Sequence, residues 1–235
     1  MRTKEYSIIV IIVLLTIALP IIGDWSSTVQ ISKDFSKVVN QQLAYQSTTL
    51  VITMIFLLLL WRLKSTEFTN YFKKGTIDAM ITPVPQVGIK PKSTENWIHL
   101  GINFSVVITL VTVVVIYFQV IHTNEFDYSK LLYALPISIG FALVNSFVEE
   151  SITRLGIVVV LKNKIQDKHI MLVSGMLFGC VHYFGTPGGI SGVLVAGFLG
   201  WFLAKSILET RGFFWAWLIH FLQDIVIITA MLATQ

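Results

Sequence analysis

Seven long apolar stretches are the feature that most restricts how this chain of 235 residues can fold. A helix needs roughly 20 residues to cross a bilayer, and the stretches centre on that length, although the fourth is long and the fifth is short. Only 13% of the residues are charged, compared with about 25% in a soluble domain. The sequence therefore predicts an all-α polytopic membrane protein, a single bundle of about seven (seven to eight) transmembrane helices. The stretches cover residues 7–23, 44–61, 98–121, 131–161, 169–184, 189–208 and 213–233.

Two of these stretches have unusual starts. The first follows Arg2 and Lys4 as the core of a signal peptide would. No A-x-A cleavage pattern comes after it, so we expect a retained helix. The fourth contains Pro136 near its start, which predicts a kink or a separate turn at that point.

The positions of lysine and arginine predict which side of the membrane each loop occupies, because positively charged residues gather in cytoplasmic loops. If the N-terminus is inside, the outer loops contain only Lys33, Lys37 and Lys130. We therefore expect a multi-pass protein of the cell (cytoplasmic) membrane, with its N-terminus inside and its C-terminus outside. The inner segments would hold Arg2, Lys4, Arg62, Lys64, Lys73, Lys74, Lys90, Lys92, Lys162, Lys164, Lys168, Lys205 and Arg211.

Other residues at the ends of the stretches agree with this arrangement. Trp25, Trp61 and Trp97 fall at span ends, where indole rings favour the membrane interface.

The net charge of +4 comes from lysines beside the spans, so membrane lipids are expected partners and nucleic acid is not. Cys180 is the only cysteine, which excludes a disulfide within the chain. The oligomeric state stays open.

Residues 62–96 form the longest inner segment. Aromatic and aliphatic side chains are mixed with lysines there, which is typical of a segment lying on the membrane surface. Pro83 and Pro85 break any helix in its second half. The simpler interpretation is a solvated connector.

Small residues recur at every fourth position in the sixth stretch, and two more lie in the fifth. Such stripes let helix backbones approach closely within lipid. We therefore expect a structural role for these stripes in close helix packing. The small residues are Gly188, Gly192, Ala196, Gly200 and Ala204, with Gly175 and Gly179 in the fifth stretch.

Three charges interrupt the fourth stretch, at Glu149, Glu150 and Arg154. Each costs roughly 2.5–3.5 kcal/mol at the centre of a membrane helix, and a functional site is the usual reason to keep them. Glu150 and Arg154 are four residues apart, so they share one helix face and are expected to pair. Glu149 points about 100° away and is left for chemistry. A purely structural ion pair between helices is the alternative.

Two further helices carry titratable side chains at a similar depth. Phe178 and His182 are four residues apart in the fifth stretch, and His220 and Asp224 are four apart in the seventh. With a rise of about 1.5 Å per residue, His182, Asp224 and Glu149 all lie about 18–21 Å from the inner ends of their helices. Unrelated core histidines would have no reason to match in depth. The sequence therefore predicts one shared site.

These residue types suit two chemistries. A carboxylate and an imidazole can activate a water molecule for amide hydrolysis, with a second imidazole stabilising the oxyanion. Alternatively, His182 and His220 could bind zinc together with Glu149 or Asp224. The H-E-x-x-H helix of common zinc proteases is absent, and the absence of G-x-S-x-G argues against a serine nucleophile.

The three motifs resemble those of a known family, the CPBP intramembrane proteases. These are the CAAX prenyl protease and bacteriocin-processing enzymes, also called the Abi family. The order and spacing are similar across residues 130–235, and the ordered set on separate membrane helices carries the resemblance. The motifs are E-E-x-x-x-R at Glu149, Glu150 and Arg154, F-x-x-x-H at Phe178 and His182, and H-x-x-x-D at His220 and Asp224.

The resemblance implies a glutamate-dependent endopeptidase with a buried active site. It implies that Glu149 activates the water and that His182 helps to hold it. His220 and Asp224 would form the oxyanion side. Eukaryotic-type prenyl proteases have asparagine where this chain has Asp224, whereas prokaryotic relatives vary there.

The resemblance also implies which residues hold the active site in place and how the chain is divided. Glu150, Arg154 and Phe178 would support the site. Residues 1–129 would provide N-terminal membrane helices and the inner-face connector, and residues 130–235 the catalytic core. No cofactor is expected, with a divalent metal such as zinc as the alternative. The small size and short loops look more like the prokaryotic members.

The expected function is intramembrane hydrolysis of a peptide bond in a membrane-associated protein or peptide, lipidated or not. The alternatives are a proton- or cation-coupled transporter and a bacteriocin immunity or scaffold protein. The sequence shows no paired inverted repeat with broken helices, which is typical of many transporters. Because the inner face is nearest His220, we expect the substrate to reach the site from the cytoplasmic half.

Overall fold

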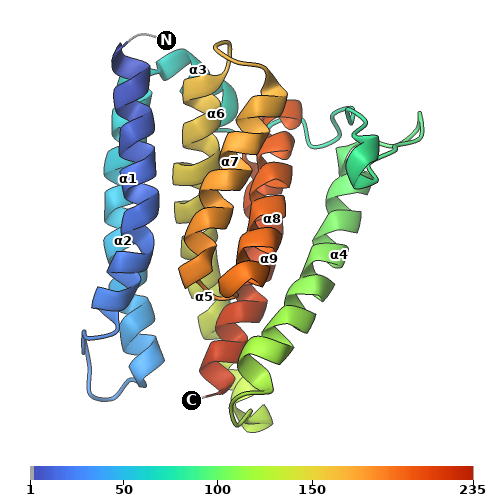
Figure 1. Cartoon of the computed structure of the whole chain (residues 1–235). Coiled ribbons are helices and arrows are strands. Elements are labelled where there is room, and N and C mark those ends of the chain that lie inside the picture. The colour runs from blue at the N-terminus through green and yellow to red at the C-terminus, as the bar shows by residue number, and fades with distance from the viewer. Residues whose placement is uncertain (1–2, 235) are drawn as a thin grey trace.

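The structure is a computed structural model that describes residues 3–234, and the regular elements within that range are helices. Six spans in this range are long and apolar enough to cross a membrane. A shorter helix, α7 (Asp167–Val181), lies beside α8 (Figure 1). The predicted all-α polytopic bundle is confirmed. The spans are α1 (Thr3–Ser26), α2 (Lys37–Leu63), α4 (Trp97–Ile116) with its π-helical extension Tyr117–Ile121, α5 (Leu131–Glu150) continued by α6 (Gly156–Leu161), α8 (Gly189–Thr210) and α9 (Phe214–Ala233).

Large apolar side chains cover the outside of the bundle. Many of those on α1, α2 and α4 are more than half exposed, which would be costly in water and is favourable against lipid tails. The chain is therefore an integral membrane protein. Examples are Leu14, Ile21, Val51, Ile55, Leu58, Val106, Leu110 and Val114.

One end of the bundle brings together the loops that contain most of the lysines. The start of α1, the end of α2 and the α6–α7 turn meet there, because Glu5 pairs with Lys64 at 2.8 Å and with Lys164 at 3.5 Å. We call this end the lysine-rich face and define it by residues 62–96, 162–168 and 210–213 together with the start of α1. It is the upper end in Figure 1.

The opposite end is the lysine-poor face, formed by the loops 27–36 and 122–130 and by the end of α9. The Asp127 N–H donates to the Ala233 carbonyl at 2.9 Å, which joins the second of these loops to α9. α1 and α9 both run from the lysine-rich to the lysine-poor face (Figure 1). An odd number of crossings, as the sequence predicts, requires the 15-residue helix α7 to be counted with the six longer spans.

Glycine allows α7 and α8 to pack in direct backbone contact. A Cβ added at Gly175 would lie 2.7 Å from the Gly197 carbonyl oxygen, and one at Gly179 would lie 2.8 Å from that of Val193. No side chain larger than hydrogen fits at these separations. The close backbone approach expected of the small-residue stripes is present, and the structure shows that it joins α7 to α8. This contact sets the position of His182 at the end of α7.

Residues 72–96, after the short helix α3 (Ser65–Tyr71), fold over the ends of two membrane helices. The Thr76 N–H donates to the Thr210 carbonyl at 2.8 Å, and the Phe213 N–H donates to the Lys73 carbonyl at 2.7 Å. The indole of Trp215 donates to the Ile77 carbonyl at 2.9 Å. The segment is therefore a structured cap, which neither sequence interpretation described fully.

This cap corrects two expectations about single residues. Lys205 is 1% exposed rather than solvated, since it pairs with Glu209 and donates to the Thr82 carbonyl at 2.7 Å. Trp97 is fully buried rather than interfacial, and its indole donates to Glu209 at 2.8 Å. Both side chains lie beneath residues 72–96, whose folding over α8 the sequence does not reveal.

The span that carries the acidic pair changes its winding directly after Glu150. α5 passes into one π-helical turn, Ser151–Leu155, and then into α6. Two hydroxyl groups support this turn: Thr153 donates to the Glu149 carbonyl at 2.6 Å, and Ser174 donates to the Thr153 carbonyl at 3.2 Å. Single π-turns of this kind are frequent at functional sites.

The start of the same span agrees only in part with the expectation for Pro136. A separate 3-10 turn, Tyr128–Lys130, does precede α5, and Pro136 lies inside that helix. The change of winding occurs further along, at Ser151–Leu155, which the sequence analysis did not predict.

Candidate active site

The seven residues singled out in the sequence come together in the middle of the bundle. Five of them line a cavity of about 300 Å³, and the other two, Glu150 and Arg154, lie behind it and are fully buried. The helices that supply them are α5 with the following turn, α7 with its 3-10 extension His182–Phe184, and α9. The residues at the cavity are Glu149, Phe178, His182, His220 and Asp224.

Glu150 links Arg154 to His220. Its Oε1 lies 3.2 Å from Arg154 Nη1 and 2.7 Å from His220 Nδ1. The predicted Glu150–Arg154 ion pair is present. A carboxylate at 2.7 Å requires the proton to be on Nδ1, so Glu150 fixes the orientation of the His220 ring. The other ring nitrogen, Nε2, therefore faces the cavity side.

Phe178 is the centre of an aromatic and cationic stack. The guanidinium of Arg154 lies 3.4 Å from its ring centroid, the His182 ring 4.1 Å and the His220 ring 5.7 Å. Within residues 3–234, Arg154 Nε and Nη2 have no hydrogen-bond partner. The ring face therefore takes up part of that charge through a cation–π contact.

The backbone sets the tautomer of His182. Its Nδ1 lies 2.9 Å from the Phe178 carbonyl oxygen, which can only accept a hydrogen bond, so Nδ1 carries the proton. In the neutral ring Nε2 is then an acceptor with a lone pair. His182 Nε2 can therefore hold a water molecule by accepting a hydrogen bond from it.

Glu149 presents one bonded and one unbonded oxygen. Oε1 accepts from the Asn145 side-chain amide at 3.1 Å, whereas Oε2 has no hydrogen-bond partner among residues 3–234 and lies 3.7 Å from His220 Nε2. The expectation that Glu149 is unpaired holds for one oxygen only. A buried carboxylate oxygen without a hydrogen-bond partner is unusual in a folded protein.

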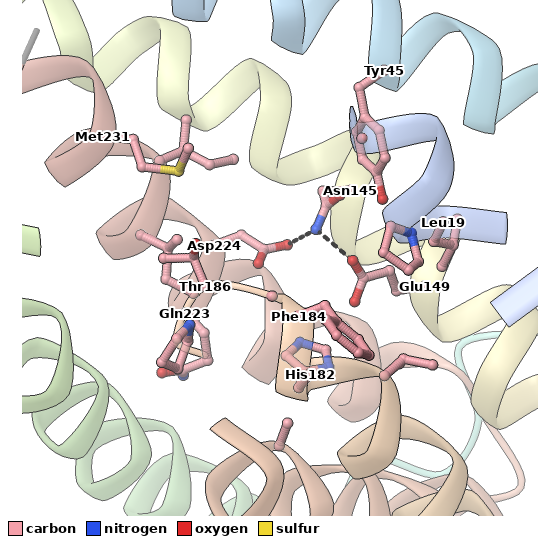
Figure 2. Close-up of a pocket in the computed structure, with 18 of the residues that line it drawn as sticks. Leu19, Tyr45, Asn145, Glu149, His182, Phe184, Thr186, Gln223, Asp224 and Met231 are labelled. Carbon is pink, nitrogen blue, oxygen red and sulfur yellow. Dashed lines mark hydrogen bonds between the residues drawn. The ribbon is translucent and has the colours of Figure 1, made fainter. Parts of the chain in front are cut away.

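Asp224 is held by a residue that the sequence analysis missed. Its Oδ2 accepts from the same Asn145 amide group at 3.1 Å, and its Oδ1 lies 3.5 Å from His220 Nε2. Figure 2 shows Asn145 between Glu149 of its own helix and Asp224 of α9. Since Glu150 already holds His220 Nδ1, Asp224 is not needed to orient that ring.

The orientation of Asn145 is fixed from α2. Gln46 Nε2 donates to Asn145 Oδ1 at 3.3 Å, so the amide NH₂ faces the two carboxylates. Gln46 also donates to Gln42 Oε1 at 3.1 Å, and Tyr45 lines the cavity beside them (Figure 2). Two signals could have revealed these residues. Asn145 is one turn before Glu149, and Gln42 and Gln46 place polar amides on adjacent turns of a membrane span, where polar groups are rare.

The same groups bear on the metal alternative. Within the described part of the chain, no group of three or more His, Cys, Asp or Glu side chains is placed to hold a metal ion. His220 Nδ1 and His182 Nδ1 are engaged with Glu150 and with the Phe178 carbonyl. A chelator experiment, described below, tests this alternative directly.

The cavity leads to the lysine-poor face. Its lining there comes from the ends of α1 and α9, the start of α2 and the loop before α8. Among the described residues, none from α6, from residues 62–96 or from the first turn of α9 contributes. The cavity lining differs from the expectation of access from the half nearest His220, because residues 72–96 cover that end. The residues that line the cavity at the lysine-poor end include Gly23, Asp24, Ser26, Gln41, Gln42, Thr186, Pro187 and Met231.

Comparison with known proteins gives one match. A family model described as type II CAAX prenyl endopeptidase Rce1-like matches residues 131–226. The matched range contains all three motifs and Asn145, whereas Tyr45 and Gln46 lie outside it. Searches of curated proteins and of solved structures found no match.

Proposed function

We propose that this protein is a glutamate-dependent intramembrane endopeptidase, on the premise that residues 131–226 match the family model of Rce1-like type II CAAX prenyl endopeptidases. The family supports a CAAX-type endopeptidase of the membrane in general, and it implies a peptide or prenylated protein as substrate. The finer proposal is that Glu149 activates a water molecule without a covalent intermediate.

The observation that carries this proposal is the unbonded Oε2 of Glu149 beside the cavity. The oxygen is positioned to take one proton from water, and His182 Nε2 can accept a hydrogen bond from the O–H that remains. The water oxygen would attack the carbonyl carbon of the peptide, and Glu149 would then pass its proton to the departing nitrogen. His220 Nε2, carrying a proton, would face the oxyanion.

The direct test is cleavage by purified protein in detergent. A library of lipidated and unlipidated peptides is incubated with wild-type protein, and the products are identified by mass spectrometry. We expect cleavage at a defined bond within a subset of the peptides. A failure to cleave any peptide or co-purifying membrane protein would favour the transporter or immunity alternatives.

The first variant to test is Asp224→Asn. The new amide oxygen can still accept from Asn145, and the new NH₂ adds a donor on the oxyanion side. We expect substantial activity to remain, and we expect no inhibition of wild type by a metal chelator. Both proteins should be assayed with and without chelator, and again after zinc is added. A dead variant together with a chelated wild type that zinc restores would establish a metalloprotease.

Asn145 should be a positioning residue for both carboxylates. In Asn145→Leu each carboxylate loses a buried hydrogen bond that is worth about 1–3 kcal/mol, which corresponds to roughly 5–150-fold. We expect this loss in kcat with little change in KM, because Asn145 aligns Glu149 rather than the substrate. Gln46→Leu, which frees only the amide orientation, should show a smaller loss of the same kind. An unchanged kcat in Asn145→Leu would remove the residue from the mechanism.

A further inference from the structure

We propose that the substrate of this enzyme reaches the site from the lysine-poor face, and that this face is the outer side of the membrane. The substrate class is then an exported peptide or a peptide segment anchored in the outer leaflet. This inference rests on the proposed protease function and deepens it. A prenylated protein arriving from the cytoplasm would approach the opposite face.

A continuous set of polar groups leads inward from the lysine-poor face. Gln41, at the start of α2, donates to the Gly23 carbonyl at the end of α1, and both residues line the cavity. The adjacent Gln42 accepts from Gln46, which lies one turn further in and bonds to Asn145 beside the two carboxylates. Polar side chains on a membrane helix mark a path that water or a substrate backbone can follow.

The opposite wall of the same path is apolar. Leu19, Ile228 and Met231 line the cavity at the ends of α1 and α9. A channel with one amide-rich and one apolar wall suits a peptide, whose backbone needs hydrogen bonds and whose side chains can contact the apolar wall. Asp24, which is exposed, stands at the mouth.

The lysine-rich end of the site is closed by packed protein. Every residue of α6 is buried, as are Glu150 and Arg154 between it and the cavity. Residues 72–96 add a second layer through their bonds to Thr210, Phe213 and Trp215. A peptide approaching from that end would have to displace this cap.

The distribution of solvated charge assigns the two faces. Lys205 and Arg154 are buried and paired with Glu209 and Glu150, so they do not report orientation. The lysines and arginines that remain still favour the lysine-rich face as cytoplasmic, because such residues resist translocation. Those on the described lysine-rich face are Lys4, Arg62, Lys64, Lys73, Lys74, Lys90, Lys92, Lys162, Lys164, Lys168 and Arg211, against Lys33, Lys37 and Lys130 on the other.

Cysteine labelling tests the geometry without relying on activity. Gln41→Cys and Met231→Cys place a thiol at the mouth, and Lys33→Cys and Lys92→Cys mark the two faces, all in a Cys180→Ser background. With a membrane-impermeant maleimide on intact cells, we expect the mouth positions and position 33 to label. Position 92 should label only in inverted vesicles. Mouth positions that label together with position 92, or a position 92 that labels in intact cells, would overturn the proposal.

Cleavage in oriented proteoliposomes then separates this inference from the protease function. A peptide that the detergent-solubilised enzyme cleaves is added outside vesicles sorted by labelling at position 33. We expect cleavage when the lysine-poor face is outward and its loss when that face is inward. Cleavage only with the lysine-rich face outward would overturn the route while the protease function stands. If the enzyme in detergent cleaves nothing, the protease function fails and the substrate class fails with it, whatever the labelling shows.

Discussion

Glu149→Gln should abolish cleavage while the protein remains folded and inserted in the membrane. Loss of a general base alone costs about 10²–10⁴-fold, and here the same carboxylate would also position the attacking water, so we expect the upper end of that range. The fold should survive because the amide oxygen of glutamine can still accept from Asn145, which bonds to Glu149 at 3.1 Å. Turnover of a cleavable peptide is measured beside a thermal melt in detergent.

The matched control is Glu149→Asp, which keeps a carboxylate but shortens the side chain by one methylene. We expect a partial loss, since an aspartate oxygen can still accept a proton but sits further from the cavity. The order of activity should therefore be wild type, then Glu149→Asp, then Glu149→Gln. Near-normal turnover by Glu149→Gln would end the assignment of this residue as the base.

Arg154→Ala should give the largest loss of stability of the substitutions considered. The guanidinium is fully buried, 3.2 Å from Glu150 and 3.4 Å from the ring centroid of Phe178. Its removal leaves a buried carboxylate with one cationic partner fewer, and breaking such a pair costs about 3–5 kcal/mol. We expect lower abundance in the membrane and a lower melting temperature in detergent.

Two controls show whether burial is the cause. Lys162→Ala breaks an exposed ion pair with Asp167, in which the side chains are 25% and 50% exposed, and should cost at most about 1 kcal/mol. Arg154→Lys keeps the charge but loses the planar contact with Phe178, so it should fall between wild type and Arg154→Ala. If Arg154→Ala melts like wild type, the buried pair does not stabilise the bundle.

Sequence reasoning located the membrane spans and most of the residues at the cavity. A span is recognisable because the free energy of moving a helix into lipid is nearly a sum over its own residues. The Glu150–Arg154 pair was predictable for the same reason, since residues four apart on one helix meet whatever surrounds them. The common depth of Glu149, His182 and Asp224 followed from the helical rise alone.

The contacts that complete the site depend on tertiary structure. Asn145 meets Asp224 across 79 residues of sequence, and Gln46 meets Asn145 across 99. No local pattern encodes which faces of α2, α5 and α9 turn toward one another, because that choice depends on how all the helices pack together. The roles of Gln46 and Asn145 were invisible for this reason.

The side on which the cavity opens was decided in the same way. Lysine counting assigns loops to sides, and it placed His220 nearest the inner end of its helix. It cannot tell that residues 72–96 fold over the ends of α8 and α9 and close that end. Each charged residue of a loop adds its own contribution to the side of the membrane on which the loop stays. A cap forms only where the loop meets complementary backbone groups of other elements, such as the carbonyl of Thr210 and the N–H of Phe213.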